Sequence, residues 1–530
     1  MNISKNISNS LVIFIIVITC LFFTININLV EITIMEARNF VTAREMLIDN
    51  NWLMPTFNGE PRYQKPPLPT WIAAISTFIF GTKTLYFFRI PGFLCLALIG
   101  ITTYCFSLEL LKNKTHSIIN SFIIITSFYT IAIIIEAPWD IFSHSFMFLA
   151  IYYIYKNLNH YKLKLKETLL IILFVACSVL SKGPVSIYAL LIPFLISYFI
   201  TYPKTIRTKL VRIFPIILAG LVIGSSWYIM LLFEDSENLI STTKKETLNW
   251  TNYNIRPFYY YWSFFIQSGI WALIALLSLS YPYYKNKIKN YKNYKFTFLW
   301  TVIGVILLSL IPEKKPRYLM PILIPLALNI GFIYRHLIDV FNKSKSAKLI
   351  LLFHYLLIMS IGLSFIVLKL YILNLSINFI DIFLFSLSLL ILIKLFNIKS
   401  LPIIKLNIIS LLILIFSISN SPTLILKTNK DYNGVDSLNS DELDFYTNYS
   451  ISPEIIWDFG KKIIRLNDVE IRKITQSNKK FGVFTKDPIP IKDTIINKLN
   501  YTIKLISKHD LNTTNKKNRL ITYYHLFTPN

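Results

Sequence analysis

The chain has 530 residues, of which 54% are hydrophobic and only 15% charged, with a mean hydropathy of +0.53. This composition excludes an ordinary soluble domain and is typical of a protein that crosses a membrane many times. The net charge of +26 would favour nucleic acid binding in a soluble protein, but here the basic residues gather in alternate loops, as the orientation of membrane helices requires.

The apolar windows of the chain predict about 13 membrane spans, because the hydrocarbon core is about 30 Å thick and a helix rises about 1.5 Å per residue. The first window lacks a cleavage pattern and is interpreted as an uncleaved anchor. The run 68–80 is shorter and contains Pro69 and Trp71, which favours a helix lying at the interface. The windows are 11–30, 85–111, 117–135, 140–156, 167–181, 184–201, 211–233, 261–281, 295–312, 318–336, 348–371, 377–396 and 402–419.

The loops that are rich in lysine and arginine would share the cytoplasmic face with the amino terminus. The opposite loops would then lie outside, among them 31–84, 234–260 and the stretch from Pro312 to Arg317. We therefore predict an all-α polytopic membrane domain over residues 1–425, with 31–84 as its first outer loop.

The carboxyl-terminal part changes in character, because Asn, Asp and Lys become frequent there and the apolar runs become short. Phe481–Thr485, Tyr501–Ser507 and Arg519–Phe527 have the composition of strands. We predict a small α/β domain over residues 426–530, outside the cytoplasm because thirteen crossings precede it.

Residues 34–49 follow a helical period. Arg38, Thr42, Glu45 and Asp49 form a polar stripe, and apolar residues such as Phe40 form the opposite one. A helix with two such faces is predicted to lie flat on a membrane surface.

Charged residues in this outer loop have two interpretations each. Glu36 lies three residues after Thr33, so it fits a capping box, but it also faces a partly desolvated environment that suits a reactive carboxylate. Arg38 is consistent with a headgroup anchor, and Lys65 with a lysine that snorkels to the interface. Because Pro66 and Pro67 restrict the backbone after Lys65, its ammonium is also suited to hold a phosphate.

Several motifs resemble those of ArnT-like glycosyltransferases, which are related to the protein O-mannosyltransferases and have the GT-C architecture. The resemblance covers roughly residues 10–340 in order, whereas the later spans and the tail are similar in layout only. Its motifs are Glu36-Ala37-Arg38, Arg44-Glu45-Met46, Asn51-Trp52, Pro55, Asn58-Gly59, Tyr63, Lys65-Pro66-Pro67-Leu68, Arg89-Ile90-Pro91, Trp139-Asp140, Ser181-Lys182-Gly183-Pro184 and Lys314 to Pro321.

The resemblance implies an inverting transfer of a sugar from a polyprenyl phosphate to an acceptor on the outer side of the bacterial cytoplasmic (inner) membrane. Such a reaction needs a carboxylate to take the acceptor proton and cations to meet the departing lipid phosphate. The catalytic candidates are Glu36 and Asp140. The substrate-binding candidates are Arg38, Lys65, Lys182, Lys314, Arg317 and Tyr318.

Each of these residues also has a plain structural interpretation. Asp140 suits a helix cap, and Lys182 with Gly183 and Pro184 suits a simple turn between spans. Tyr318 is typical of an interfacial aromatic belt. The bases near Arg317 fall on the outer side, against the orientation rule, which favours an anionic partner for them.

Two departures from the family pattern affect the implied chemistry: the first leaves Glu36 or Asp140 as the proton acceptor, and the second removes one possible metal ligand. Met35 stands where family members often carry Asp, and Gln64 stands where they often carry Glu. The sequence assigns no cofactor. A divalent metal is the one candidate cofactor, and the sequence does not define its ligands.

Two other classes of function remain open from the sequence. A transporter or flippase of lipid-linked glycans also needs many spans, although internal repeats are absent here. A non-catalytic scaffold is the third hypothesis. The sequence does not identify the sugar, the acceptor (a lipid A-like glycolipid, another glycan or a protein hydroxyl) or the oligomeric state.

Overall fold

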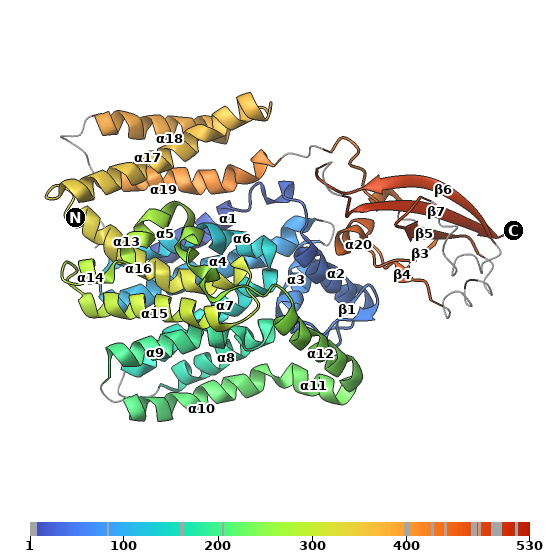
Figure 1. Cartoon of the computed structure of the whole chain (residues 1–530), viewed down its shortest axis with the longest axis horizontal. Helices are drawn as coiled ribbons and strands as arrows, with labels where there is room; N and C mark the ends of the chain where they lie inside the picture. Colours follow the sequence, from blue (N-terminus) through green and yellow to red (C-terminus); the bar gives the residue numbers. More distant parts are fainter. Residues whose placement is uncertain are drawn as a thin grey trace. The chain divides into compact units, whose positions relative to one another are not determined.

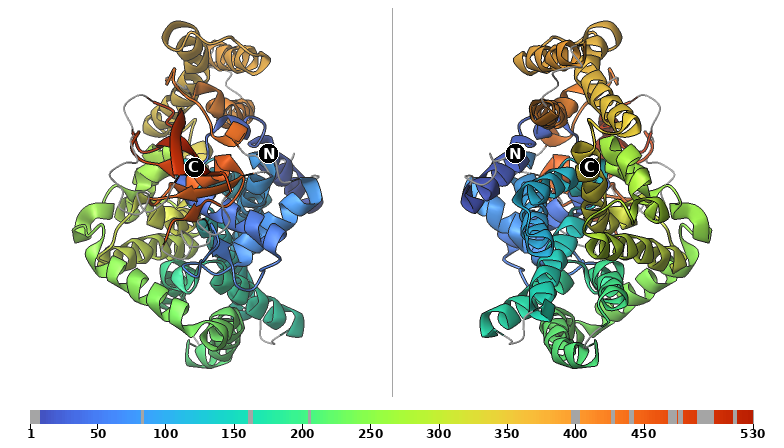
Figure 2. Two further views of the ribbon diagram at one scale, coloured as in Figure 1. Left: turned by 90° about the vertical axis from the view of Figure 1, so that its right-hand side faces the viewer. Right: turned by 90° about the vertical axis from the view of Figure 1, so that its left-hand side faces the viewer.

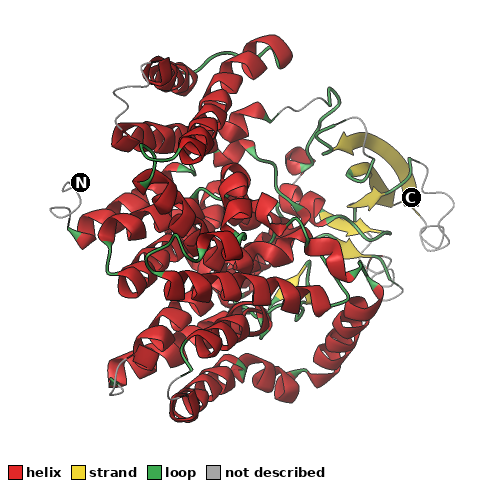
Figure 3. Ribbon diagram, turned by 60° about the vertical axis from the view of Figure 1, so that its left-hand side comes forward, coloured by secondary structure: helices red, strands yellow, loops and turns green. Residues whose placement is uncertain are grey.

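The computed structural model describes residues 8–81, 84–159, 164–203, 206–396, 403–425, 429–438, 443–467, 474, 479–488, 501–514 and 518–529. The chain folds as two compact units. Unit 1 comprises residues 1–30 with 63–424, and unit 2 comprises 31–62 with 425–530. All the described strands lie in unit 2 (Figure 3). Residues 31–62, which the sequence analysis placed with the membrane domain, thus group with the carboxyl-terminal residues.

Unit 1 is helical, and helices lie in each of the thirteen windows predicted to span (Figure 1). The principal helices are α1 (Asn9–Phe22), α3 (Leu68–Phe80), α4 (Leu85–Leu111), α5 (Lys114–Ile125), α6 (Phe128–Glu136), α7 (Pro138–Asn159), α8 (Leu165–Lys182), η3 (Ile187–Leu191), α9 (Ile192–Thr201), α10 (Ile206–Gly224), α11 (Ser226–Glu234), α12 (Ser236–Asn252), α13 (Ala272–Ser278), α15 (Tyr291–Leu310), α16 (Met320–Asp339), α17 (Lys345–Val367), α18 (Phe379–Phe396) and α19 (Ile403–Asn420). Short 3-10 helices η4 (Phe258–Tyr261), η5 (Phe264–Trp271) and η6 (Pro316–Leu319) connect some of them.

Within the described residues, eight helical stretches are long and apolar enough to cross a membrane by themselves. The window 117–135 is a bent pair instead, because α5 and α6 meet at 43° across a short break. The windows in α7, α8, α9 and α18 are not among these eight stretches, and the one in α9 lies in a shorter apolar helix, Ile187–Thr201. The chain is a multi-pass membrane protein, and the count of about 13 crossings stays a prediction.

Helix α7 occupies the centre of unit 1, where it packs against α8 and α4. Its side chains from Pro138 to Ser145 are all buried. Aromatic rings of α4, α7, α9 and α15 meet beside it, and the ring of Phe106 lies 5.8 Å from that of Trp300. Helices α17, α18 and α19 form a separate three-helix group, visible in Figures 1 and 2. The amino-terminal end of α7 is therefore held by a rigid core.

Unit 2 contains a five-stranded sheet in the order β4-β3-β5-β7-β6. Strand β3 is parallel to β4 and β5, whereas β7 is antiparallel to β5 and β6. The strands predicted at 481–485, 501–507 and 519–527 are confirmed as β5, β6 and β7. The bounds are β3 Asp444–Thr447, α20 Pro453–Phe459, β4 Ile464–Arg465, β5 Phe481–Thr485, β6 Tyr501–Asp510 and β7 Ile521–Pro529.

Helix α2 (Ile34–Asp49) packs on α20 in the same unit. Its Arg44 donates to the carbonyl oxygen of Ile456 at 2.9 Å and lies over the ring of Trp457. The predicted polar stripe is not its solvent side, because Thr42 and Glu45 are buried and Ile48 is 70% exposed. The reason is that these polar groups bond to neighbouring chain segments, which sequence periodicity does not reveal.

Glu45 organises the hairpin that follows α2. Strands β1 (Thr56–Phe57) and β2 (Glu60–Pro61) are joined by Asn58 and Gly59, whose φ angles of 56° and 82° suit a two-residue hairpin turn. The Glu45 carboxylate accepts from the backbone N–H groups of Asn58 at 2.6 Å and Gly59 at 3.2 Å. Its burial thus has a structural explanation.

Candidate active site

The centre of the candidate site is a buried ion pair between the first turn of α7 and the last turn of α8. The Nζ atom of Lys182 lies 2.6 Å from Oδ1 of Asp140, and the two side chains are 10% and 2% exposed. The second carboxylate oxygen of Asp140, Oδ2, is buried without a hydrogen-bond partner among the described residues. Asp140 is therefore not a helix cap, and it keeps a free acceptor atom.

Element η6 brings two more of the predicted residues to this pair. The ring of Tyr318 lies 5.5 Å from the ammonium nitrogen of Lys182. The charge of Arg317 acts on both Asp140 and Lys182, which places its guanidinium in the same electrostatic neighbourhood. Its Nε atom is buried and has no partner within the described chain. The site thus combines cations with buried polar atoms that lack hydrogen-bond partners. Such unsatisfied atoms are rare in protein interiors.

Glu313 and Lys315, a further acid and a further cation of the same predicted outer loop, extend the cluster. Glu313 accepts a hydrogen bond from the hydroxyl of Tyr318 at 3.0 Å and forms an ion pair with Lys315. The hydroxyl of Tyr261 ties this loop down, because it donates to the carbonyl oxygen of Lys315 at 3.0 Å. The sequence signal was the acid directly before two lysines, but nothing in the sequence showed which lysine it would hold.

Lys314 has a different environment from the other predicted cations. It is 3% exposed, and its ammonium donates to the carbonyl oxygens of Ile311 at 2.6 Å and Arg256 at 3.0 Å. Burial lowers the pKa of this ammonium. Its observed contacts therefore hold the loop, and a contact with substrate stays a prediction.

Lys65 stands before α3 and is more open than Lys182. Its ammonium lies 3.7 Å from the carboxylate of Glu246 on α12, and the side chains are 28% and 38% exposed. Its charge also acts on Lys182. The charges of Lys65 and Arg317 thus both act on Lys182.

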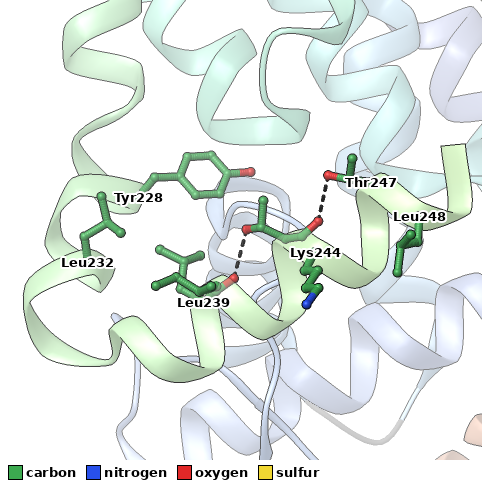
Figure 4. Close-up of a pocket in the computed structure, with 8 residues that line it drawn as sticks. Tyr228, Leu232, Leu239, Lys244, Thr247 and Leu248 are labelled. Carbon is green, nitrogen blue, oxygen red and sulfur yellow. Dashed lines mark hydrogen bonds between the residues drawn. The ribbon is translucent and has the colours of Figure 1, made fainter. Parts of the chain in front are cut away.

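A groove is formed by residues of α11 and α12 (Figure 4). It has a volume of about 620 Å³, and Leu232, Leu239 and Leu248 give it an apolar lining. Tyr228 forms part of its wall, and the Tyr228 hydroxyl lies 3.7 Å from the point where a Cβ on Gly183 would stand. The groove therefore borders the turn that carries Lys182.

Glu36 and Arg38 belong to unit 2, whereas the other six predicted site residues belong to unit 1. The capping box at the start of α2 is confirmed: Glu36 accepts from the N–H of Thr33 at 3.1 Å, and its own N–H donates to the Thr33 hydroxyl. Arg38 is exposed. Burial of Arg62 lowers the pKa of its guanidinium to about 9, and the charge of Arg38 acts in the same direction. A catalytic role for Glu36 stays a prediction.

The described residues contain no group of three or more His, Cys, Asp or Glu side chains arranged to hold a metal ion. The Asp140 carboxylate is already neutralised by Lys182. This donor set does not fit a divalent metal, which prefers several carboxylate oxygens, so no step is assigned to one.

Comparison with known proteins gives a matching family segment and a similar fold. Residues 64–229 match the dolichyl-phosphate-mannose-protein mannosyltransferase family. Over its whole length the fold is similar to that of crystal structures of ArnT from Cupriavidus metallidurans. With the structure bound to undecaprenyl phosphate the TM-score is 0.73 at 12% identity, covering 98% of each chain. With the apo structure the TM-score is 0.69 at 13% identity, covering 97% of each chain. The chain therefore has a fold similar to that of ArnT, and part of it matches the mannosyltransferase family model.

Sequence relatives of this chain include two undecaprenyl phosphate-alpha-4-amino-4-deoxy-L-arabinose arabinosyl transferases. The one from Wigglesworthia glossinidia brevipalpis is 26% identical over 310 residues, which is 56% of this chain and 53% of the relative. The one from Photorhabdus laumondii is 23% identical over 302 residues, covering 55% and 53%. The chain thus spans about half the length of the curated relatives it matches.

Proposed function

We propose that this ArnT-like chain is a membrane glycosyltransferase that moves a sugar from a polyprenyl-phosphate donor to an envelope acceptor. The observation that carries the proposal is the buried Asp140–Lys182 pair beside Arg317, with one carboxylate oxygen and one guanidinium nitrogen unsatisfied. Buried polar atoms without partners cost free energy, so their retention favours a functional reason. The names of the relatives, which include undecaprenyl phosphate, support the class of donor.

The chemistry follows from the charges of the cluster. The acceptor oxygen attacks the anomeric carbon, a new C–O bond forms, and the bond from that carbon to the phosphate oxygen breaks with its electron pair. Oδ2 of Asp140 takes the acceptor proton, because Oδ1 is held by Lys182. Lys182, Arg317 and Lys65 stabilise the negative charge of the departing lipid phosphate. Tyr318 forms the wall on which the sugar rests.

The groove between α11 and α12 suits the polyprenyl chain of the donor. Its lining is mainly apolar apart from Lys244, and its Tyr228 lies close to Gly183. Its threonine hydroxyls donate to backbone carbonyls of α12. A chain of this kind would gain roughly 25 cal/mol for each Å² of apolar surface that it buries there.

The orientation proposed from the charge distribution places the cluster on the outer face of the bacterial cytoplasmic membrane. The acceptor is an envelope glycolipid, glycan or protein hydroxyl.

The direct test uses the purified full chain in liposomes with synthetic polyprenyl-phosphate sugars and envelope acceptors. Mass spectrometry should detect both a glycosylated acceptor and a free polyprenyl phosphate. Lys182→Ala should abolish both products, whereas the exposed Lys345→Ala should not. Movement of the intact lipid-linked sugar across the bilayer without transfer would overturn the proposal in favour of a flippase, and binding without turnover would favour a scaffold.

A further inference from the structure

Two serines tie α7 to α8 directly beneath the Asp140–Lys182 pair. The hydroxyl of Ser178 donates to the carbonyl oxygen of Ser143 at 2.8 Å, and the hydroxyl of Ser143 lies 3.1 Å from the carbonyl oxygen of Ser178. Both side chains are fully buried. Ser143 follows Asp140 by three residues and Ser178 precedes Lys182 by four, so each serine lies one helical turn from its charged neighbour.

These hydrogen bonds extend to Ser186, which follows the turn at Gly183 in the chain. The hydroxyl oxygen of Ser186 lies 2.7 Å from that of Ser143 and 2.8 Å from Nδ1 of His144. Both Ser186 and His144 are buried, at 0% and 2% exposure. The hydroxyl bonds therefore hold the chain to α7 both before and after the turn at Gly183.

The turn itself needs such support. Gly183 has a φ of 69°, a conformation that side chains other than glycine rarely adopt, and α8 ends at Lys182. A lysine at the last helical residue before a glycine turn has no helix beyond it to fix its direction. The four bonded residues supply that restraint, because buried hydrogen bonds between helices have few alternative partners.

We propose that Ser143, Ser178, Ser186 and His144 are positioning residues that set the relative placement of Asp140 and Lys182. They do not touch the substrate in this scheme, and they act only through the ion pair. The expected effect of these residues on kinetics rests on the function proposed above. Their expected effect on the separation of positions 140 and 182 does not depend on that function.

The geometric test measures the separation of positions 140 and 182 directly. In a full-length chain whose four natural cysteines are replaced by alanine, Asp140→Cys and Lys182→Cys are joined by a short thiol cross-linker. We expect Ser143→Ala with Ser186→Ala to slow cross-linking at least fivefold. The control is Ser197→Ala on α9, a buried serine whose hydroxyl donates to Pro193 of its own helix at 2.6 Å. An unchanged rate in the double variant would overturn the proposal.

The kinetic test uses the chain with its native cysteines. Ser178→Ala should lower kcat/KM for the lipid-linked donor about tenfold, while Ser178→Thr, which keeps the hydroxyl, should restore most of it. Melting temperatures for the alanine variant and for Ser197→Ala should agree. Equal kinetics in these two variants would overturn the role of the serine. Slower cross-linking without any sugar transfer in the wild type would leave the positioning role standing and would reject only the proposed function.

Discussion

The amino end of α7 and the amino end of α2 both carry a carboxylate that the sequence marks as reactive, yet the two differ in how their charges are used. Glu36 on α2 accepts the capping N–H of Thr33, and Glu45 farther along the same helix holds a hairpin turn. Asp140 on α7 meets a lysine from another helix and keeps one oxygen without a partner. The difference shows that a high density of charged residues in the sequence does not identify a site. The hydrogen-bond partners of each group show whether the fold uses it or whether it is available for chemistry.

The largest expected effect is at the α7–α8 pair. Asp140→Asn removes the proton acceptor while preserving shape, and it should lower kcat for sugar transfer by about 10²–10⁴-fold, the usual contribution of a general base. Initial rates with saturating donor and acceptor in proteoliposomes measure this. Retention of more than a tenth of the wild-type kcat would show that Asp140 only orients Lys182.

The second test concerns Glu36, where glutamine and alanine variants separate the two interpretations. Glutamine keeps the capping box, so Glu36→Gln should retain transfer activity within about threefold, whereas Glu36→Ala should lower the melting temperature by removing a cap worth about 1 kcal/mol. A hundredfold loss of kcat in Glu36→Gln at unchanged melting temperature would instead make Glu36 the base.

A smaller and purely structural effect is expected at Glu45. Glu45→Ala removes the buried carboxylate that accepts from the N–H groups of Asn58 and Gly59, so it should destabilise unit 2 by about 1–3 kcal/mol. Proteolysis of the 50–62 loop should become faster. The matched control is Asp49→Ala on the same helix, which removes only a partly exposed ion pair with Lys462 and should cost less than about 1 kcal/mol. Equal losses in both variants would contradict the assignment.

The smallest effect concerns the loop that precedes Lys65. The hydroxyl of Tyr63 donates to Asp235 at 2.7 Å, and this bond holds the pKa of the Asp235 carboxyl below its ordinary value of 3.8. A lowered folded-state pKa stabilises the fold above pH 3.8, and that contribution is lost as the pH falls through the lowered value.

Tyr63→Phe should therefore melt lower than the wild type at pH 7, and the difference should shrink below about pH 3.8. Melting curves between pH 3 and pH 7 measure it, with Asp235→Asn completing a double-mutant cycle. A deficit of the same size at both ends of this range would mean that Tyr63 acts through packing against Trp227.

The sequence by itself determined the class of protein, the positions of the apolar helices, strands β5, β6 and β7 of the carboxyl-terminal sheet and the capping box at Glu36. These features depend on local patterns, namely apolar length, periodicity and the spacing of a cap, which neighbouring residues dictate regardless of the rest of the chain. The motifs also pointed to Asp140, Lys182, Arg317 and Tyr318 as members of one site.

Only the tertiary structure decided which charges have partners. It showed that residues 31–62 belong with the carboxyl-terminal sheet, that Lys314 holds backbone carbonyls, and that serines beneath Asp140 bind α7 to α8. The physical reason is that a hydrogen bond depends on atoms brought together from distant segments, and a single sequence records the residue types but not which of them meet.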